Sequence, residues 1–124
     1  MNIDSPENYI FNCAAYTSTH DSNTLRGWFE TEAGAGQIER LGECIGRKTA
    51  GEQMHWKVIK FAMNSKARLV IVAMQDVLGL GSKARMNVPG TVAKSNWTWR
   101  LGRGRVDHAV VSRLKRMTRG SGRC

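Results

Sequence analysis

A chain of 124 residues, 41% of them hydrophobic and 23% charged, has the size and composition of one small globular domain. It contains no run of about 18 apolar residues that could span a membrane. The N-terminal residues are polar and acidic, unlike a secretory signal. Three widely spaced cysteines fit neither a disulfide framework nor a zinc site, so we expect a cytoplasmic protein.

The net charge of +9 is unevenly distributed along the chain. Residues 1–45 contain seven acidic and two basic residues, whereas residues 100–124 contain eight basic residues and one acidic residue. This basic segment is compatible with binding to nucleic-acid phosphates. It is equally compatible with the solvated face of a terminal helix, because charge alone rarely identifies a function. A small nucleic-acid-binding module is therefore kept as an alternative function.

The first half of the chain predicts one strand followed by helices. A short apolar segment over residues 11–17 predicts a strand that ends just before His20 and Asp21. Residues 30–45 show apolar positions at helical spacing, although three glycines weaken the pattern. Residues 52–66 show the same spacing more strongly, without an interrupting proline.

The second half begins with a predicted second strand. LVIVAM, Leu69 to Met74, has six apolar residues without alternation, which predicts a parallel strand buried on both faces. Strand, helix and strand form a βαβ unit, so the predicted fold class is α/β. The glycine-rich residues 75–102 are predicted to form a long loop, which is usually functional or disordered when it has this length. Residues 106–118 predict an amphipathic terminal helix.

Two patterns suggest chemistry that their surroundings do not support. Residues 79–84 match the GxGxxA dinucleotide pattern, but they do not follow the strand directly, and the acid expected about 20 residues further on is missing. His20 and Asp21 resemble the base and the orienting acid of a catalytic triad. We expect them to point to opposite faces of an extended segment, which would prevent that pairing.

Three longer motifs carry a resemblance to a known family. They are PENYIFNCAAYTSTHDSNTLRGWF at residues 6–29, LVIVAMQDVLGLGSKARMNVPGT at 69–91 and NWTWRL at 96–101. In order and spacing, over roughly residues 6–123, they resemble the C-terminal part of the amylomaltases. These enzymes are the 4-alpha-glucanotransferases, or disproportionating enzymes, of glycoside hydrolase family 77.

The resemblance implies a (β/α)8 TIM barrel that moves α-1,4-glucan segments to a new acceptor by a retaining mechanism. Asp21 falls in the T-H-D motif that contains a third catalytic carboxylate, which stabilises the oxocarbenium-like transition state. His20 and Asn87 correspond to substrate-binding positions. The expected partners are malto-oligosaccharides or other α-1,4-glucans, and no cofactor, nucleic acid or membrane is implied.

The resemblance also sets the expected extent of the chain. Residues 1–124 would form the C-terminal portion of a catalytic barrel, about two βα units and the terminal helix, because a complete barrel needs about 250 residues. The nucleophile and the acid–base residue would then lie upstream, so we expect this chain alone to be inactive. For a full-length plant or algal parent, a plastid location is also compatible with the resemblance.

Four residues depart from the family motifs. Ser18 replaces a glycine, and Ser22 and Asn23 replace an asparagine and an aspartate beside Asp21. Glu7 replaces the histidine of the P-H-N-Y motif. These changes alter polar contacts close to the expected transition-state stabiliser.

The roles of several residues near these motifs stay open. Trp97 and Trp99 either stack on sugar rings or pack against the barrel. Gln75 and Asp76 either contact substrate or brace the rim of the site. Arg85 either pairs with a carboxylate or fixes its loop.

The remaining chemistry-bearing residues are interpreted as structural. We expect Cys13 and Cys44 to be buried as small hydrophobic residues. His55 and His108 lie in predicted helices without partners at metal-ligand spacing, so we expect no metal.

Overall fold

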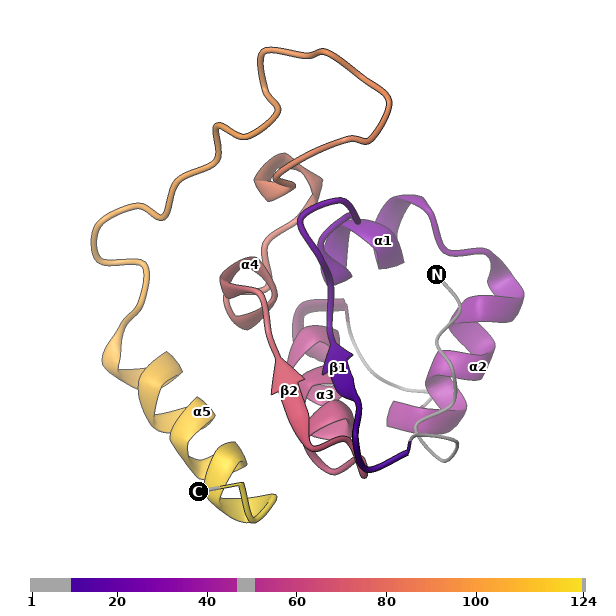
Figure 1. Cartoon of the computed structure of the whole chain (residues 1–124), viewed down its shortest axis with the longest axis vertical. Helices are drawn as coiled ribbons and strands as arrows, with labels where there is room; N and C mark the ends of the chain where they lie inside the picture. Colours follow the sequence, from indigo (N-terminus) through magenta and orange to yellow (C-terminus); the bar gives the residue numbers. More distant parts are fainter. Residues whose placement is uncertain (1–9, 47–50, 124) are drawn as a thin grey trace.

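A computed structural model of the chain describes residues 10–46 and 51–123. In chain order the elements are β1 (Ala14–Tyr16), α1 (Leu25–Thr31), α2 (Ala35–Ile45), α3 (Gly51–Met63), β2 (Leu69–Ile71), α4 (Met74–Val77), the 3₁₀ helix η2 (Ser82–Ala84) and α5 (His108–Gly120). After η2 an irregular segment arches away from the other elements before the chain returns in α5 (Figure 1).

The two strands are parallel neighbours, as the βαβ pattern predicts. β1 and β2 pair in the register Ala14 with Leu69, Ala15 with Val70 and Tyr16 with Ile71. The helices α1, α2 and α3 form the connection between the strands. The α/β class predicted from the sequence is confirmed.

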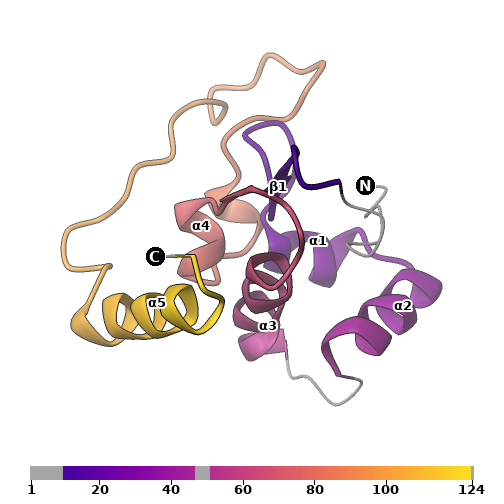
Figure 2. The same cartoon turned by 60° about the horizontal axis from the view of Figure 1, so that its bottom comes forward.

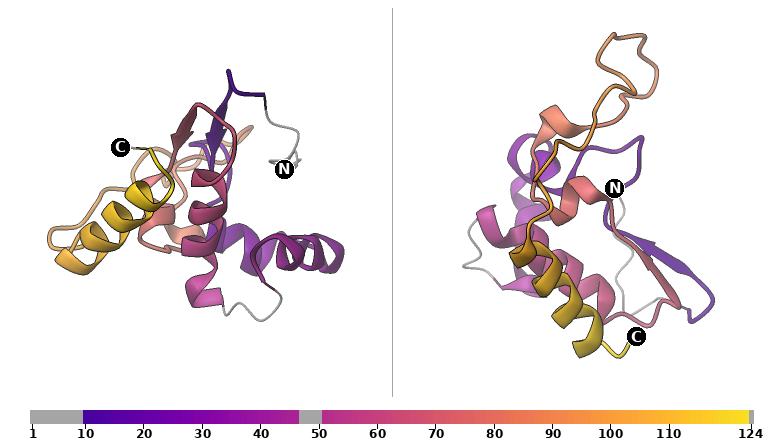
Figure 3. Two further views of the ribbon diagram at one scale, coloured as in Figure 1. Left: turned by 90° about the horizontal axis from the view of Figure 1, so that it is seen from below. Right: turned by 90° about the vertical axis from the view of Figure 1, so that its left-hand side faces the viewer.

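The helices cover one side of the two-stranded sheet, which leaves its other side open (Figure 3). α3 lies at the centre of this layer and contacts α1, α2, α4 and α5 (Figure 2). One apolar cluster joins α1, α2 and α3, and a second joins α3 to α4 and α5. The buried members of the first are Leu25, Trp28, Leu41 and Met54, and those of the second are Trp56, Ile59, Met63 and Val77. Burying each such side chain contributes about 1.5–3 kcal/mol.

Local hydrogen bonds divide the helix predicted over residues 30–45 into two. The Trp28 carbonyl oxygen accepts hydrogen bonds from Glu32 N–H at 2.9 Å and from Ala33 N–H at 2.8 Å, which ends α1. α2 begins after Gly34, whose amide donates to Gln37 Oε1 at 2.9 Å. The predicted helix is therefore correct only for its second part.

The basic C-terminal segment is partly engaged within the chain. The Arg113 guanidinium lies over the Trp56 ring, 4.8 Å from its centroid. Arg123 donates to the Met63 carbonyl oxygen at 2.6 Å and to the Ser65 carbonyl oxygen at 3.0 Å, where α3 ends. These contacts give two of its arginines a role in docking α5.

Two sequence-based expectations for this half of the chain are wrong. The second strand is not buried on both faces, because Leu69 is 53% and Ile71 is 40% exposed on the side that no described helix covers. The segment 75–102 is not a loop throughout, because α4 and η2 lie within or overlap it. Both strands are also shorter than predicted.

The cysteine prediction fails for one residue. Cys44 is exposed because it lies on the outer face of the amphipathic helix α2. Cys13 is half-buried. Cys124 and Glu7 lie outside the described residues. Within the described ranges, no helix is both long enough and apolar enough to cross a membrane.

His55 is a buried histidine at the centre of the helical layer. Its side chain packs against the turn after α4, where Gly79 has a φ of +63° and where a Cβ would lie 2.6 Å from the His55 ring. Burial lowers the pKa of His55, the charges of Arg113 and Arg26 lower it further, and Asp76 partly opposes them. The folded protein therefore binds a proton at this ring less readily than the unfolded chain does.

The lowered pKa of His55 predicts a pH-dependent stability. The free energy of unfolding should be unaffected by this group above its ordinary pKa of 6.5 and should fall below it, by at most about 1.4 kcal/mol per pH unit, down to the folded-state pKa. Urea titrations in dilute protein between pH 7.5 and 5 measure the slope. His55→Gln should flatten it, whereas the exposed His108→Gln should not. Equal slopes for both variants would contradict the assignment.

The uncovered sheet face predicts self-association of the 124-residue chain. Apolar side chains beside unpaired strand edges favour contacts between molecules. Leu69→Lys combined with Ile71→Lys should reduce the mass seen by light scattering. Val92→Lys, at a fully exposed loop position, controls for the added charge. If the unsubstituted 124-residue chain is monomeric, or if Val92→Lys reduces the mass equally, this face does not drive association.

Candidate active site

A cavity of about 550 Å³ lies at the carboxyl ends of the two parallel strands. This volume falls within the range of about 300–1,000 Å³ typical of ligand pockets. Ligand sites in α/β folds occur at this end of the strands. The lining residues follow β1, follow β2 or come from the segment after η2, and they include Ser18, Thr19, His20, Gln75, Arg85 and Met86.

The Asp76 carboxylate braces the floor of this region. Only 1% of Asp76 is exposed. Its Oδ2 atom accepts hydrogen bonds from Thr17 Oγ1 at 2.7 Å and from Ser18 Oγ, and its Oδ1 atom accepts one from Leu25 N–H at 2.8 Å. The carboxylate thus joins the end of β1 and the start of α1 to α4. Of the two roles left open, Asp76 has the bracing one.

Residues 19–22, which follow Ser18, form a tight turn. Thr19 N–H donates to Ser22 Oγ at 2.9 Å, and Ser22 N–H donates to the Thr19 carbonyl oxygen at 3.3 Å. Because the chain turns here, His20 Nε2 lies 3.3 Å from Asp21 Oδ2, with both side chains at least half exposed. The expectation that these side chains point to opposite faces is wrong, because it assumed an extended backbone.

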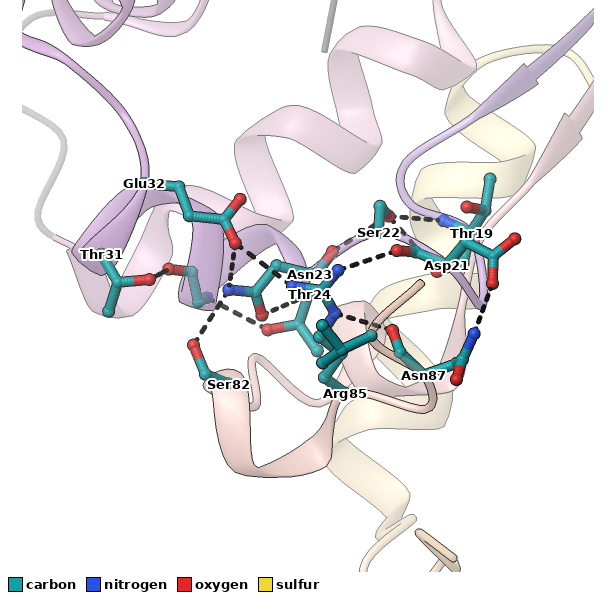
Figure 4. Close-up of polar contacts among 12 residues, drawn as sticks. Thr19, Asp21, Ser22, Asn23, Thr24, Thr31, Glu32, Ser82, Arg85 and Asn87 are labelled. Atoms are coloured by element: carbon teal, nitrogen blue, oxygen red, sulfur yellow. Dashed lines mark hydrogen bonds and ion pairs between the residues drawn. The ribbon is translucent and has the colours of Figure 1, made fainter. Parts of the chain in front are cut away.

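Asn87 reaches Asp21 from the other side of the site. Asn87 Nδ2 donates to Asp21 Oδ1 at 2.9 Å, although the two residues are 66 positions apart (Figure 4). Asp21 therefore has a polar partner at each carboxylate oxygen. The structure brings together all three site residues predicted from the sequence: His20, Asp21 and Asn87.

Arg85 fixes the backbone of two of these residues with one guanidinium group. It donates to the carbonyl oxygens of Asp21 and Asn87, at 2.8 Å in each case. Its third contact is an ion pair with Glu32 Oε1 at 3.3 Å. Arg85 therefore has both roles left open, because it pairs with a carboxylate and holds its loop in place.

The residues that depart from the family motifs have partners in this network. Asn23 Nδ2 donates to Glu32 Oε1 at 3.2 Å and to Ser82 Oγ at 3.0 Å (Figure 4). This packing requires a glycine at position 27, because a Cβ there would overlap the Asn23 and Ser82 side chains. Ser18 adds a hydroxyl donor to Asp76.

The two tryptophans of the third motif differ in environment. Trp97 is 60% exposed, and its ring centroid lies 5.5 Å from that of His20. Trp99 is half-buried, and the choice between stacking on sugar rings and packing against the barrel stays a prediction for both tryptophans. No group of three or more metal-ligating side chains occurs in the described parts of the chain.

The sequence matches the model of glycoside hydrolase family 77, described as 4-alpha-glucanotransferase, over residues 1–105. The chain belongs to this family. A 4-alpha-glucanotransferase of Clostridium butyricum is 42% identical over 119 residues, which cover 96% of this chain and 24% of the relative. The chloroplastic/amyloplastic 4-alpha-glucanotransferase of Arabidopsis thaliana is 43% identical over 97 residues, or 77% of this chain and 16% of the relative.

A solved family 77 structure has the same fold over the matched region. The amylomaltase of Streptococcus agalactiae, determined in complex with acarbose, superimposes with a TM-score of 0.88 at 31% identity. The match covers 98% of this chain and 24% of that protein, and the chain spans about a sixth to a quarter of the length of the relatives it matches. The resemblance inferred from the three motifs is confirmed.

Sequence reasoning did not identify Glu32 as part of the site. Glu32 follows α1, and its partner Arg85 is 53 residues away, so no local spacing connects them. The one indication in the sequence is Arg85 of the A-R-M-N motif, because a guanidinium in a site is expected to have a carboxylate partner.

The Asp76 brace predicts a large difference between two substitutions. Asp76→Ala leaves three donors without their acceptor and should lower the free energy of unfolding by about 3 kcal/mol. Ser18→Ala removes one donor and should lower it by about 1 kcal/mol. Urea unfolding followed by tryptophan fluorescence measures both. Equal small losses would show that the carboxylate does not hold β1, α1 and α4 together.

Proposed function

We propose that this chain forms the part of a 4-alpha-glucanotransferase active site that stabilises the transition state of glucan transfer. The observation that carries the proposal is the Asp21 carboxylate. It is half exposed at the carboxyl ends of the strands and is oriented by Asn87 and His20 within the family's own motif. Retaining transfer between α-1,4-glucans passes through an oxocarbenium-like state that such a carboxylate stabilises.

Asp21 would act electrostatically, since positive charge develops on the sugar ring as the glycosidic bond breaks. The Asn87 amide and the Arg85 clamp fix the carboxylate before substrate arrives, so little reorganisation accompanies the reaction. His20 and Asn87 flank the Asp21 carboxylate with an imidazole and an amide. These groups suit hydrogen bonding to sugar hydroxyls.

The nucleophile and the acid–base residue are not assigned to this chain. From the family resemblance we expect both in a part of the barrel that precedes these motifs, and this chain covers 24% of the Clostridium butyricum relative. The proposed substrate is therefore an α-1,4-glucan or malto-oligosaccharide bound by the complete barrel. The acarbose in the solved relative is consistent with that substrate class.

No comparison supports the nucleic-acid-binding alternative. Arg113 and Arg123 contact Trp56 and backbone carbonyl oxygens within the chain, which gives these two basic residues a structural role. A cytoplasmic location stays a prediction, and the Arabidopsis thaliana relative is a plastid protein by its name.

A hybrid enzyme tests the proposed function directly. The matched segment of the Clostridium butyricum relative is exchanged for this chain, and release of glucose from maltotriose measures disproportionation. We expect the hybrid to be active and the 124-residue chain alone to be inactive. An inactive but folded hybrid, beside an active parent enzyme, would show that this chain does not support glucan transfer.

Asp21→Asn in this hybrid should lower kcat by about 100- to 1,000-fold and change KM much less, because the charge acts in the transition state. Glu39→Gln, which removes an exposed carboxylate on α2, is the matched control and should leave both constants unchanged. Near-normal turnover of Asp21→Asn would show that a different carboxylate stabilises the transition state.

A further inference from the structure

Trp97 has an unusual backbone conformation. Its φ is +63°, and within residues 10–46 and 51–123 it is the only residue other than glycine with a positive φ. A bulky side chain in this left-handed region is rare and costs free energy. Residues held in this way cluster at functional sites.

The preceding loop holds Trp97 in this conformation. Trp97 N–H donates to the Met86 carbonyl oxygen at 2.6 Å, which closes the loop at its base. Within it, Asn96 Oδ1 accepts from Val88 N–H at 3.2 Å, and Asn96 Nδ2 donates to Thr91 Oγ1 at 3.0 Å. The loop is thus built to place residue 97 at one defined point.

The described residues of this chain do not bury the indole. The residue is 60% exposed, so burial offsets little of the conformational cost. The ring contacts His20, with centroids 5.5 Å apart and planes inclined by 34°. His20 and Met86, which both contact Trp97, line the cavity at the ends of the strands. Trp97 therefore extends the wall of that cavity outward.

The geometry points to a sugar-binding subsite on the exposed face of the Trp97 indole. The ligand is a glucosyl unit of an α-1,4-glucan, next to the unit at Asp21, because His20 separates the indole from that carboxylate by a single side chain. A pyranose ring presents an apolar face of C–H groups, which suits the negative face of an aromatic ring. This inference rests on the proposed function and adds a residue that determines affinity for the glucan.

Two substitutions in the hybrid enzyme separate the ring from the loop. Trp97→Gly removes the indole but suits a φ of +63°, so the loop keeps its shape. It should raise KM for maltotriose about tenfold and leave kcat within about threefold, because the contact is made equally in the ground and transition states. Trp97→Phe keeps an aromatic face and should raise KM by about threefold or less. Trp99→Phe, at the half-buried neighbour, should leave KM unchanged.

Equilibrium binding makes the test independent of turnover. Calorimetric titration of maltotriose into the hybrid with Asp21→Asn should give a Kd that rises about tenfold when Trp97→Gly is added. An unchanged Kd and KM would overturn the subsite. A fall in kcat at constant KM would also overturn it, because the ring would then act only through His20. Loss of turnover in the unsubstituted hybrid would overturn the proposed function instead, and the titration would still decide the subsite.

Discussion

The rim of the candidate site depends on one buried carboxylate. Asp76 lies in α4, yet its carboxylate oxygens accept hydrogen bonds from the two residues that follow β1 and from the first amide of α1. The turn with His20 and Asp21 starts from this braced point, so its direction is set before any ligand is present. Because the hydroxyl of Ser18 takes part, the serine at the family's glycine position adds to the brace. The structure accommodates this departure from the family motif through the hydrogen bond from Ser18 to Asp76.

Arg85 provides a second constraint, on the backbone of Asp21 and Asn87. The planar guanidinium of Arg85 holds three acceptors in a fixed fork, which a lysine would not reproduce. Glu32 supplies the counter-charge and also accepts from Asn23. The backbone of Asp21, whose carboxylate we assign to catalysis, is therefore fixed by Arg85, and Arg85 is itself fixed by Glu32. Such a preorganised arrangement is what electrostatic stabilisation of a transition state requires.

Periodicity and motif order predicted the features that depend on local sequence. The helix predicted over residues 52–66 appears as α3, that over 106–118 as α5, and the parallel pairing follows from the βαβ pattern. Motif order alone indicated His20, Asp21 and Asn87. Contacts between side chains 53 or more residues apart were not predictable, since Glu32 and Arg85 share no local pattern. The exposure of Leu69 and Ile71 was also missed, because an apolar run does not reveal whether its second face is covered.

The long sequence separation between Asp21 and Asn87 has a consequence for how the site arises during synthesis. These residues are 66 positions apart, so at roughly 5–20 residues per second the turn with Asp21 emerges several seconds before its partner. By the time Asn87 emerges, α1, α2, α3, β2 and α4 have all been synthesised, whereas α5 is still to come. Contacts of such high sequence separation form late, since the intervening chain must first be ordered. The contact between Asp21 and Asn87 therefore forms only after the three helices and the second strand between them have been made.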